Sequence, residues 1–80
     1  MKNWQDYITS DAGILNGKPI IKNTRLSVEF IVGRLANGWS EEQILESYPR
    51  LKKEGLLAVY AYLYSCVQDG LLFMPREARA

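Results

Sequence analysis

Residues 17–49 read GKPIIKNTRLSVEFIVGRLANGWSEEQILESYP and contain a turn, a short extended piece and two helices with capping residues. The turn begins at Asn16-Gly17, the strongest short turn signal in the chain, because both residues tolerate a positive φ. Pro19 has no backbone N–H to donate, so a strand beside it is an edge strand or is irregular. This stretch decides the fold, and the rest of the chain extends it on both sides.

We expect a small β element before the helices. Residues 4–9, Ile20-Ile21 and Leu26 are its short strand pieces. Two or three strands of this length are not stable alone. The element must therefore pack against the helices that follow.

The first helix is predicted from Val28 to about Asn37. Ser27 can cap its N-terminus, and Glu29 places a negative charge in the first turn, where it is favoured. Gly38 suits the left-handed residue that ends a helix. The helical apolar spacing is carried by Val28, Ile31, Val32 and Leu35.

The second helix is predicted to start at Ser40. Ser40 and Gln43 have the spacing of a capping box, in which each side chain bonds the other residue's backbone N–H. Ile44, Leu45 and Tyr48 form the apolar stripe. Pro49 ends the helix because the residue before a proline disfavours helical backbone angles.

The third helix is predicted from about Lys52 to Asp69, with Gly70 at its end. One apolar face contains Leu56, Val59, Tyr60, Leu63 and Val67. The helix also has a second apolar face. A helix with two apolar faces is either fully buried or shared with a partner, and full burial is hard in a chain of 80 residues. We therefore expect a homodimer or a complex with another protein. The expected partner-binding residues are Leu57, Ala61, Tyr64, Leu72 and Phe73.

The run from Ile8 to about Tyr64 resembles the bacterial family called domain of unknown function 433. The order of the motifs is specific to that family, although each motif alone is weak. The matching residues are Gly17-Lys18-Pro19, Thr24-Arg25, Val28, Gly38, Ser40, Ile44-Leu45 and Tyr48-Pro49. Two positions depart from the family pattern. Asn23 replaces a glycine before Thr-Arg, and residues 52–55 lack the usual Thr-x-Glu-Asp cap.

The resemblance implies a mainly α fold, with a three-helix, homeodomain-like (helix-turn-helix) core and a small N-terminal β element. We expect one domain over residues 1–80, divided into a β and turn element at 1–26, three helices at 27–70 and a tail at 71–80. Many members of the family look like antitoxins encoded beside a PIN-like ribonuclease toxin. The resemblance thus implies an antitoxin-like protein that binds such a toxin.

DNA is the second expected partner. The candidate phosphate contacts are Arg50, Lys52, Lys53 and Lys22. The structural alternative is that these are solvated side chains on a core that binds nothing. A net charge of +1 is also far from the profile of a strongly basic nucleic-acid binder. A stand-alone DNA-binding regulator and a structural oligomerisation module therefore remain as alternative functions.

Two further residues have more than one interpretation. Arg25 lies where a strand meets a helix, so we expect its guanidinium to bind local carboxylate or carbonyl groups and to be structural. Trp39 follows the helix-ending Gly38, and is either a core anchor or a contact residue for a partner.

The composition argues against an enzyme. The chain has no histidine and a single cysteine, so it cannot build an ordinary nucleophile–base pair, a zinc site or an internal disulfide. We expect no cofactor. The first residues lack the apolar core of a signal peptide, and no apolar run approaches the roughly 20 residues of a membrane span. A cytoplasmic protein is expected.

Overall fold

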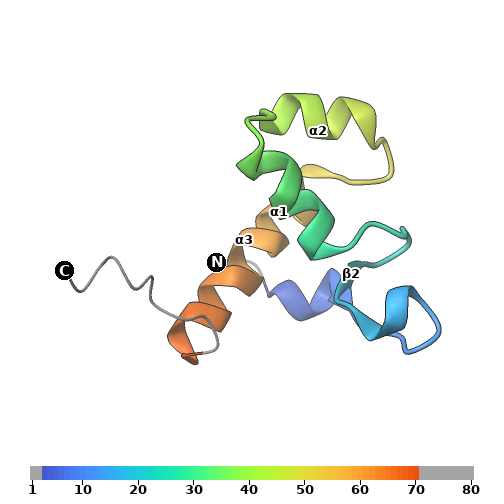
Figure 1. Cartoon of the computed structure of the whole chain (residues 1–80), viewed down its shortest axis with the longest axis vertical. Helices are drawn as coiled ribbons and strands as arrows, with labels where there is room; N and C mark the ends of the chain where they lie inside the picture. Colours follow the sequence, from blue (N-terminus) through green and yellow to red (C-terminus); the bar gives the residue numbers. More distant parts are fainter. Residues whose placement is uncertain (1–2, 71–80) are drawn as a thin grey trace.

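The computed structural model describes residues 3–70 and shows a mainly helical chain with a small two-stranded sheet near its N-terminus (Figure 1). This is the predicted fold class. The predicted tail, which includes Leu72 and Phe73, lies outside the described residues. The elements are the 3₁₀ helices η1 (Trp4–Asp6) and η2 (Leu15–Gly17), the strands β1 (Ile8–Thr9) and β2 (Ile20–Ile21), and the helices α1 (Val28–Ala36), α2 (Glu41–Ser47) and α3 (Lys53–Gln68).

The sheet pairs β1 and β2 in antiparallel register, with Ile8 opposite Ile21. The strand predicted over residues 4–9 is shorter than expected. Residues 4–6 instead form η1, because the Asn3 side chain accepts a hydrogen bond from the backbone N–H of Gln5 and the chain turns there. Leu26 is not a strand either. The neighbouring Ser27 nevertheless forms an isolated antiparallel bridge to Ile20, and the Leu26 carbonyl accepts a bond of 2.9 Å from the Ile21 N–H.

The turn between the strands has left-handed backbone angles, as the Asn16-Gly17 signal predicts. The φ angles are 51° at Leu15, 58° at Asn16 and 82° at Gly17. Leu15 was not expected in this region, which bulky side chains rarely enter. Asn23 has a φ of 66°, so asparagine takes the conformation for which the family pattern uses glycine.

The predicted helix ends are confirmed. Ser27 Oγ accepts a bond of 2.9 Å from the Phe30 N–H at the start of α1. The capping box of α2 has both bonds, 2.8 Å from the Ser40 N–H to Gln43 Oε1 and 3.1 Å from the Gln43 N–H to Ser40 Oγ. Lys52 makes no side-chain cap at α3, as the missing cap motif indicates.

The core lies where α3 crosses the sheet and the first two helices. A Cβ on Gly55 would stand 3.0 Å from Leu51 Cδ1 and 3.5 Å from Ile21 Cγ2, so α3 approaches β2 closely at this point. Among the described residues, no helix is long and apolar enough to cross a bilayer. The buried cluster contains Ile8, Ile21, Val28, Ile31, Ile44, Leu51, Leu56, Ala58 and Val59.

Candidate interaction surfaces

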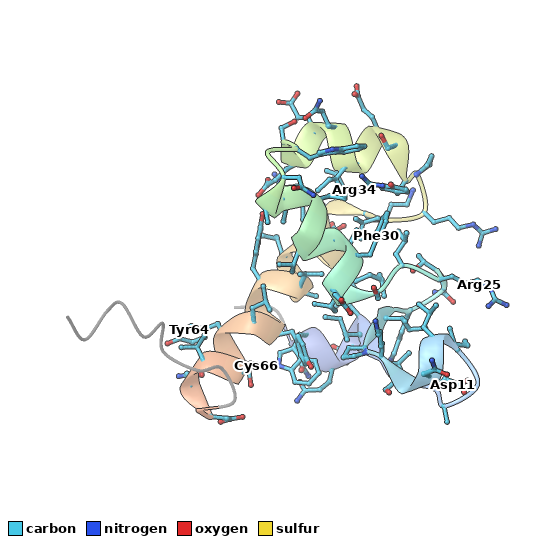
Figure 2. The ribbon with its side chains drawn as sticks, viewed as in Figure 1. Asp11, Arg25, Phe30, Arg34, Tyr64 and Cys66 are labelled. Carbon is cyan, nitrogen blue, oxygen red and sulfur yellow. The ribbon has the colours of Figure 1, made fainter. Side chains whose placement is uncertain are left out.

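Helix α3 has a continuous line of exposed apolar side chains, which we call the α3 stripe. Its members are Leu57, Tyr60, Tyr64 and Val67, with exposed fractions of 42%, 38%, 51% and 59%. Successive members are three, four and three residues apart, which is the spacing of a coiled-coil seam. Tyr64 projects outward from the helix (Figure 2). The stripe is therefore a surface that the core of this chain does not use.

The prediction of partner-binding residues on α3 is partly wrong. Leu57 and Tyr64 are exposed as expected, but Ala61 is only 5% exposed. The rotation of α3 on the core turns Ala61 inward. It turns Tyr60 and Val67 outward, although the sequence places them on the same apolar face as the buried Leu56 and Val59. The spacing of the α3 stripe marks an apolar line in the sequence, but the spacing alone does not tell whether that line faces the core or solvent.

The Tyr60 hydroxyl is already bonded within the chain. It donates to Glu41 Oε2 over 2.7 Å and so connects α3 to the first turn of α2. Partial burial raises the pKa of Tyr60 to about 12, and the hydrogen bond and negative charge of Glu41 act in the same direction. A molecule that covers the α3 stripe would meet the ring of Tyr60 rather than an unpaired hydroxyl.

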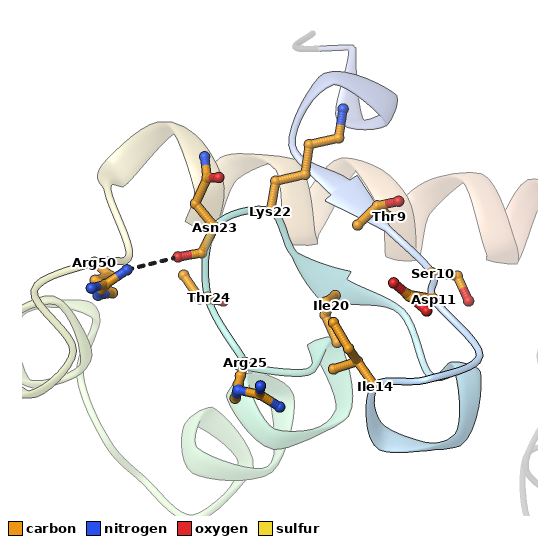
Figure 3. A pocket seen from close by; sticks show the side chains of 10 residues that line it. All are labelled: Thr9, Ser10, Asp11, Ile14, Ile20, Lys22, Asn23, Thr24, Arg25 and Arg50. Atoms are coloured by element: carbon orange, nitrogen blue, oxygen red, sulfur yellow. Dashed lines mark hydrogen bonds between the residues drawn. The ribbon is translucent and has the colours of Figure 1, made fainter.

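A second surface gathers cationic side chains around a hollow of about 780 Å³, which we call the basic groove (Figure 3). Lys22 and Arg25 come from the segment after β2, and Arg50 comes from the loop before α3. The full lining is Thr9, Ser10, Asp11, Ile14, Ile20, Lys22, Asn23, Thr24, Arg25 and Arg50.

A neighbouring hollow of about 760 Å³ shares Lys22 and Arg50 with the basic groove and adds Lys52. Three of the four predicted phosphate contacts therefore lie around two adjoining hollows. Lys53, the fourth, is exposed and lines neither of them. Asp6 and Glu54 also line the second hollow, so positive charge is denser in the basic groove.

Few of these cations have partners among residues 3–70. Arg50 Nη1 donates a long bond of 3.4 Å to the Asn23 carbonyl, while the side chains of Lys22 and Arg25 have no hydrogen bond or ion pair in this part of the chain. Lys18 differs, because its ammonium is 2.7 Å from Glu29 Oε1. That bond and the charge of Lys18 hold the pKa of Glu29 below its usual value.

The expectation that Arg25 binds local carbonyls is wrong. Thr24 takes this role, since its hydroxyl donates to the Ile21 carbonyl at 2.8 Å and accepts from the Leu26 N–H at 3.0 Å. Because Thr24 already bonds these backbone groups, the turn offers few of them to the Arg25 guanidinium. Arg25 is exposed and faces the basic groove.

Trp39 belongs to an aromatic cluster that also packs against the core. Its ring is stacked on Tyr48 with centroids 6.5 Å apart, and Tyr48 meets Phe30 edge to face at 5.5 Å. Arg34 lies between Phe30 and Trp39. Sequence reasoning overlooked Arg34, although Phe30 and Arg34 are four residues apart on a helix and therefore share a face.

No metal-binding group of three or more histidine, cysteine, aspartate or glutamate side chains occurs among residues 3–70. Cys66 is half-buried and forms no disulfide in the described part of the chain. It lies near Tyr62, whose pKa is raised by burial and by this thiol.

Two known proteins are similar to this chain. It is 36% identical over 59 residues to the uncharacterized protein y4eO of Sinorhizobium fredii (strain NBRC 101917 / NGR234), a match that covers 71% of this chain and 27% of y4eO. The chain thus spans about a quarter of that relative's length. The crystal structure of a DUF433 member protein from Anabaena variabilis ATCC 29413 superposes with a TM-score of 0.74 at 29% identity. It covers 81% of this chain and 64% of that one.

A family described as "Protein of unknown function (DUF433)" matches residues 8–63. The match spans the sheet, α1, α2 and most of α3. It includes the turn and the capping residues that the structure shows at the start of each of the first two helices. The chain therefore belongs to the DUF433 family.

Proposed function

We propose that this chain is an antitoxin-like interaction protein, which binds a partner protein through the α3 stripe. The resemblance described above makes a PIN-like ribonuclease toxin the expected partner. The single observation that carries the proposal is the heptad-spaced line of exposed apolar side chains on a helix whose other side is already in the core.

Isolated exposed apolar residues are ordinary, but a contiguous line of large ones is typical of an interaction site. Covering Leu57 and Val67 removes apolar area from water. Because each is already about half covered, each contributes roughly half of the 1.5–3 kcal/mol that full burial of such a side chain gives. Tyr60 and Tyr64 add rigid aromatic surface at low entropic cost. The stripe has the chemistry of a helix that packs against an apolar groove or another helix.

The test is co-purification of this chain with the product of the adjacent gene. Leu57→Lys places a charge within the α3 stripe, at its N-terminal end, and should abolish the complex. Leu15→Lys is the matched control, because Leu15 is also an exposed leucine (45%) but lies in η2. If the folded Leu57→Lys variant retains as much of the adjacent gene product as the wild type does, the proposal is overturned.

A second candidate function is DNA binding, and the specific observation that favours it is the convergence of Lys22, Arg50 and Lys52 around adjoining hollows. About three phosphate contacts per subunit predict a log–log salt slope near −3 for B-DNA. Gel shifts on the upstream region at two salt concentrations test this. Lys52→Gln should weaken binding more than Lys53→Gln, since Lys53 lies outside both hollows. Equal effects of the two substitutions would argue against this surface.

A third candidate arrangement is pairing of the α3 stripe with the α3 stripe of a second copy of the chain. Light scattering at micromolar concentrations would then show a dimer without any other protein. Leu57→Lys should convert this dimer to a monomer. A monomer both alone and with the adjacent gene product would contradict the interaction proposal in either form.

A further inference from the structure

We propose that Arg34, held between Phe30 and Trp39, is a docking site for a carboxylate side chain of a partner protein. Arg34 and Phe30 lie on α1, well away from Tyr64 of the α3 stripe (Figure 2). The inference is independent of the proposed function, since it concerns other residues and a different chemical group.

The guanidinium of Arg34 is clamped by two rings. Its Cζ atom is 4.8 Å from the centroid of Phe30 and 4.9 Å from that of Trp39. The turn at Gly38 brings Trp39 back over the helix, and the Trp39 N–H donates to the Arg34 carbonyl at 3.1 Å. Tyr48 packs on both rings. Arg34 is therefore restrained before any ligand arrives, which reduces the entropy lost on binding.

The hydrogen-bonding edge of Arg34 has no protein partner among residues 3–70. Nε is buried and unpaired, whereas the two terminal nitrogens contact solvent and make no hydrogen bond to the described residues. A guanidinium that stacks on aromatic rings uses its faces and leaves its edge for a planar anion. Because Nε is covered, we assign the ligand to the two terminal nitrogens, which match the two oxygens of a carboxylate.

The surroundings favour a single negative charge presented by a protein. A hollow of about 360 Å³ beside Arg34 also contains Lys18 and Glu29, which pair with each other and leave Arg34 as the unpaired charge. Phe30 is 36% exposed and offers apolar surface next to the cation. Arginine, tryptophan and tyrosine together are the residue types enriched at the centres of protein interfaces. The polyanionic backbone of a nucleic acid fits the basic groove better.

The test uses sodium acetate as the probe and NMR of isotope-labelled protein as the readout. At constant ionic strength, replacing chloride by acetate should produce saturable shifts at the Arg34 side-chain N–H groups and at the Trp39 indole N–H. Arg25 is the matched control in the same spectrum, because it is an exposed arginine without an aromatic clamp. The side-chain N–H signals of Arg25 should shift by less than about a third as much as those of Arg34.

Two substitutions separate charge from geometry. Arg34→Lys retains the charge but loses the planar edge, and should weaken acetate binding at least about fivefold, as judged at Trp39. Phe30→Leu removes one of the two rings beside Arg34 and should weaken acetate binding by a smaller factor. Backbone spectra of each variant establish that the fold is retained, and the wild-type comparison of Arg34 with Arg25 decides the question if a variant does not fold.

Three results would overturn the proposal. The first is identical spectra in acetate and in chloride, which we do not expect of a restrained guanidinium. Arg34→Lys could bind acetate as tightly as the wild type, which would reduce the site to a point charge. Inorganic phosphate could bind at Arg34 more tightly than acetate, which would assign the site to nucleic acid instead.

Discussion

The hydroxyl of Tyr60 donates a hydrogen bond of 2.7 Å to the carboxylate of Glu41, so one bond joins the middle of α3 to the first turn of α2. The two residues are 19 positions apart in the chain. The bond positions the Tyr60 ring within the α3 stripe. It also gives the interaction surface a dependence on pH that can be measured.

We expect the Tyr60–Glu41 bond to be lost at alkaline pH. The pKa of Tyr60 is raised to about 12 from 10.0. A raised pKa in the folded state means that the stabilisation is complete below about pH 10 and disappears as the pH rises toward 12. Tyr60→Phe should therefore reduce the loss of stability between these pH values in urea unfolding.

Tyr64→Phe is the matched control for this measurement, because Tyr64 lies on the same stripe and its hydroxyl forms no hydrogen bond among residues 3–70. Tyr62 also has a raised pKa and retains its own contribution in both variants. An alkaline profile of Tyr60→Phe identical to that of the wild type would contradict the prediction.

The capping box of α2 should contribute measurably to the free energy of unfolding. Ser40→Ala removes the acceptor of the Gln43 N–H bond, and loss of such a cap costs about 1 kcal/mol. In a domain of this size that corresponds to a fall in Tm of roughly 4–8 °C. Ser47→Ala, at the exposed end of the same helix, should change Tm by far less. Equal falls in Tm for the two variants, measured by calorimetry, would argue against a capping role for Ser40.

Two glycines in helices should respond differently to substitution by alanine. A Cβ on Gly33 would meet nothing within 4 Å, whereas one on Gly55 would be 3.0 Å from Leu51 Cδ1. Gly33→Ala should therefore stabilise the protein by about 0.5–1 kcal/mol through helix propensity. Gly55→Ala should lose this gain, because the tight contact with Leu51 opposes it. Denaturant midpoints compare the two directly, and equal stabilisation would show that α3 can shift away from β2.

The turn after β2 should depend on Thr24 rather than on Arg25. Thr24→Val removes both side-chain bonds that close the turn and leaves the partly buried Leu26 N–H unpaired, whereas the Ile21 carbonyl keeps its bond from the Thr24 N–H. We expect a loss of about 1–3 kcal/mol. Arg25→Ala should change the unfolding free energy by less than about 0.5 kcal/mol, as is usual for an exposed side chain. A larger loss for Arg25→Ala than for Thr24→Val would reverse this assignment.

The sequence by itself determined the ends of α1 and α2. Caps act between residues two to four positions apart, so Ser27 and the Ser40–Gln43 box can be recognised without knowledge of the rest of the chain. The left-handed turn at Asn16-Gly17 is predictable for the same reason. The order of these local signals also carries the family resemblance.

Only the tertiary structure decided which side of α3 faces solvent. Several apolar faces are available on this helix, and the choice depends on the volume offered by the core, where Gly55 allows close approach to β2. That packing buries Ala61 and exposes Tyr60 and Val67. A pattern of apolar residues indicates that a helix has a buried side, but it does not give the rotation of the helix about its axis.

The candidate sites depend on tertiary structure for a related reason. Lys22 and Arg50 lie 28 positions apart in the sequence and meet because the loop before α3 packs against the turn after β2, where Arg50 bonds the Asn23 carbonyl. Arg34 acquires its second ring only when Gly38 reverses the chain. Local sequence sets the ends of the helices through short-range hydrogen bonds, whereas long-range packing sets which side chains share a surface.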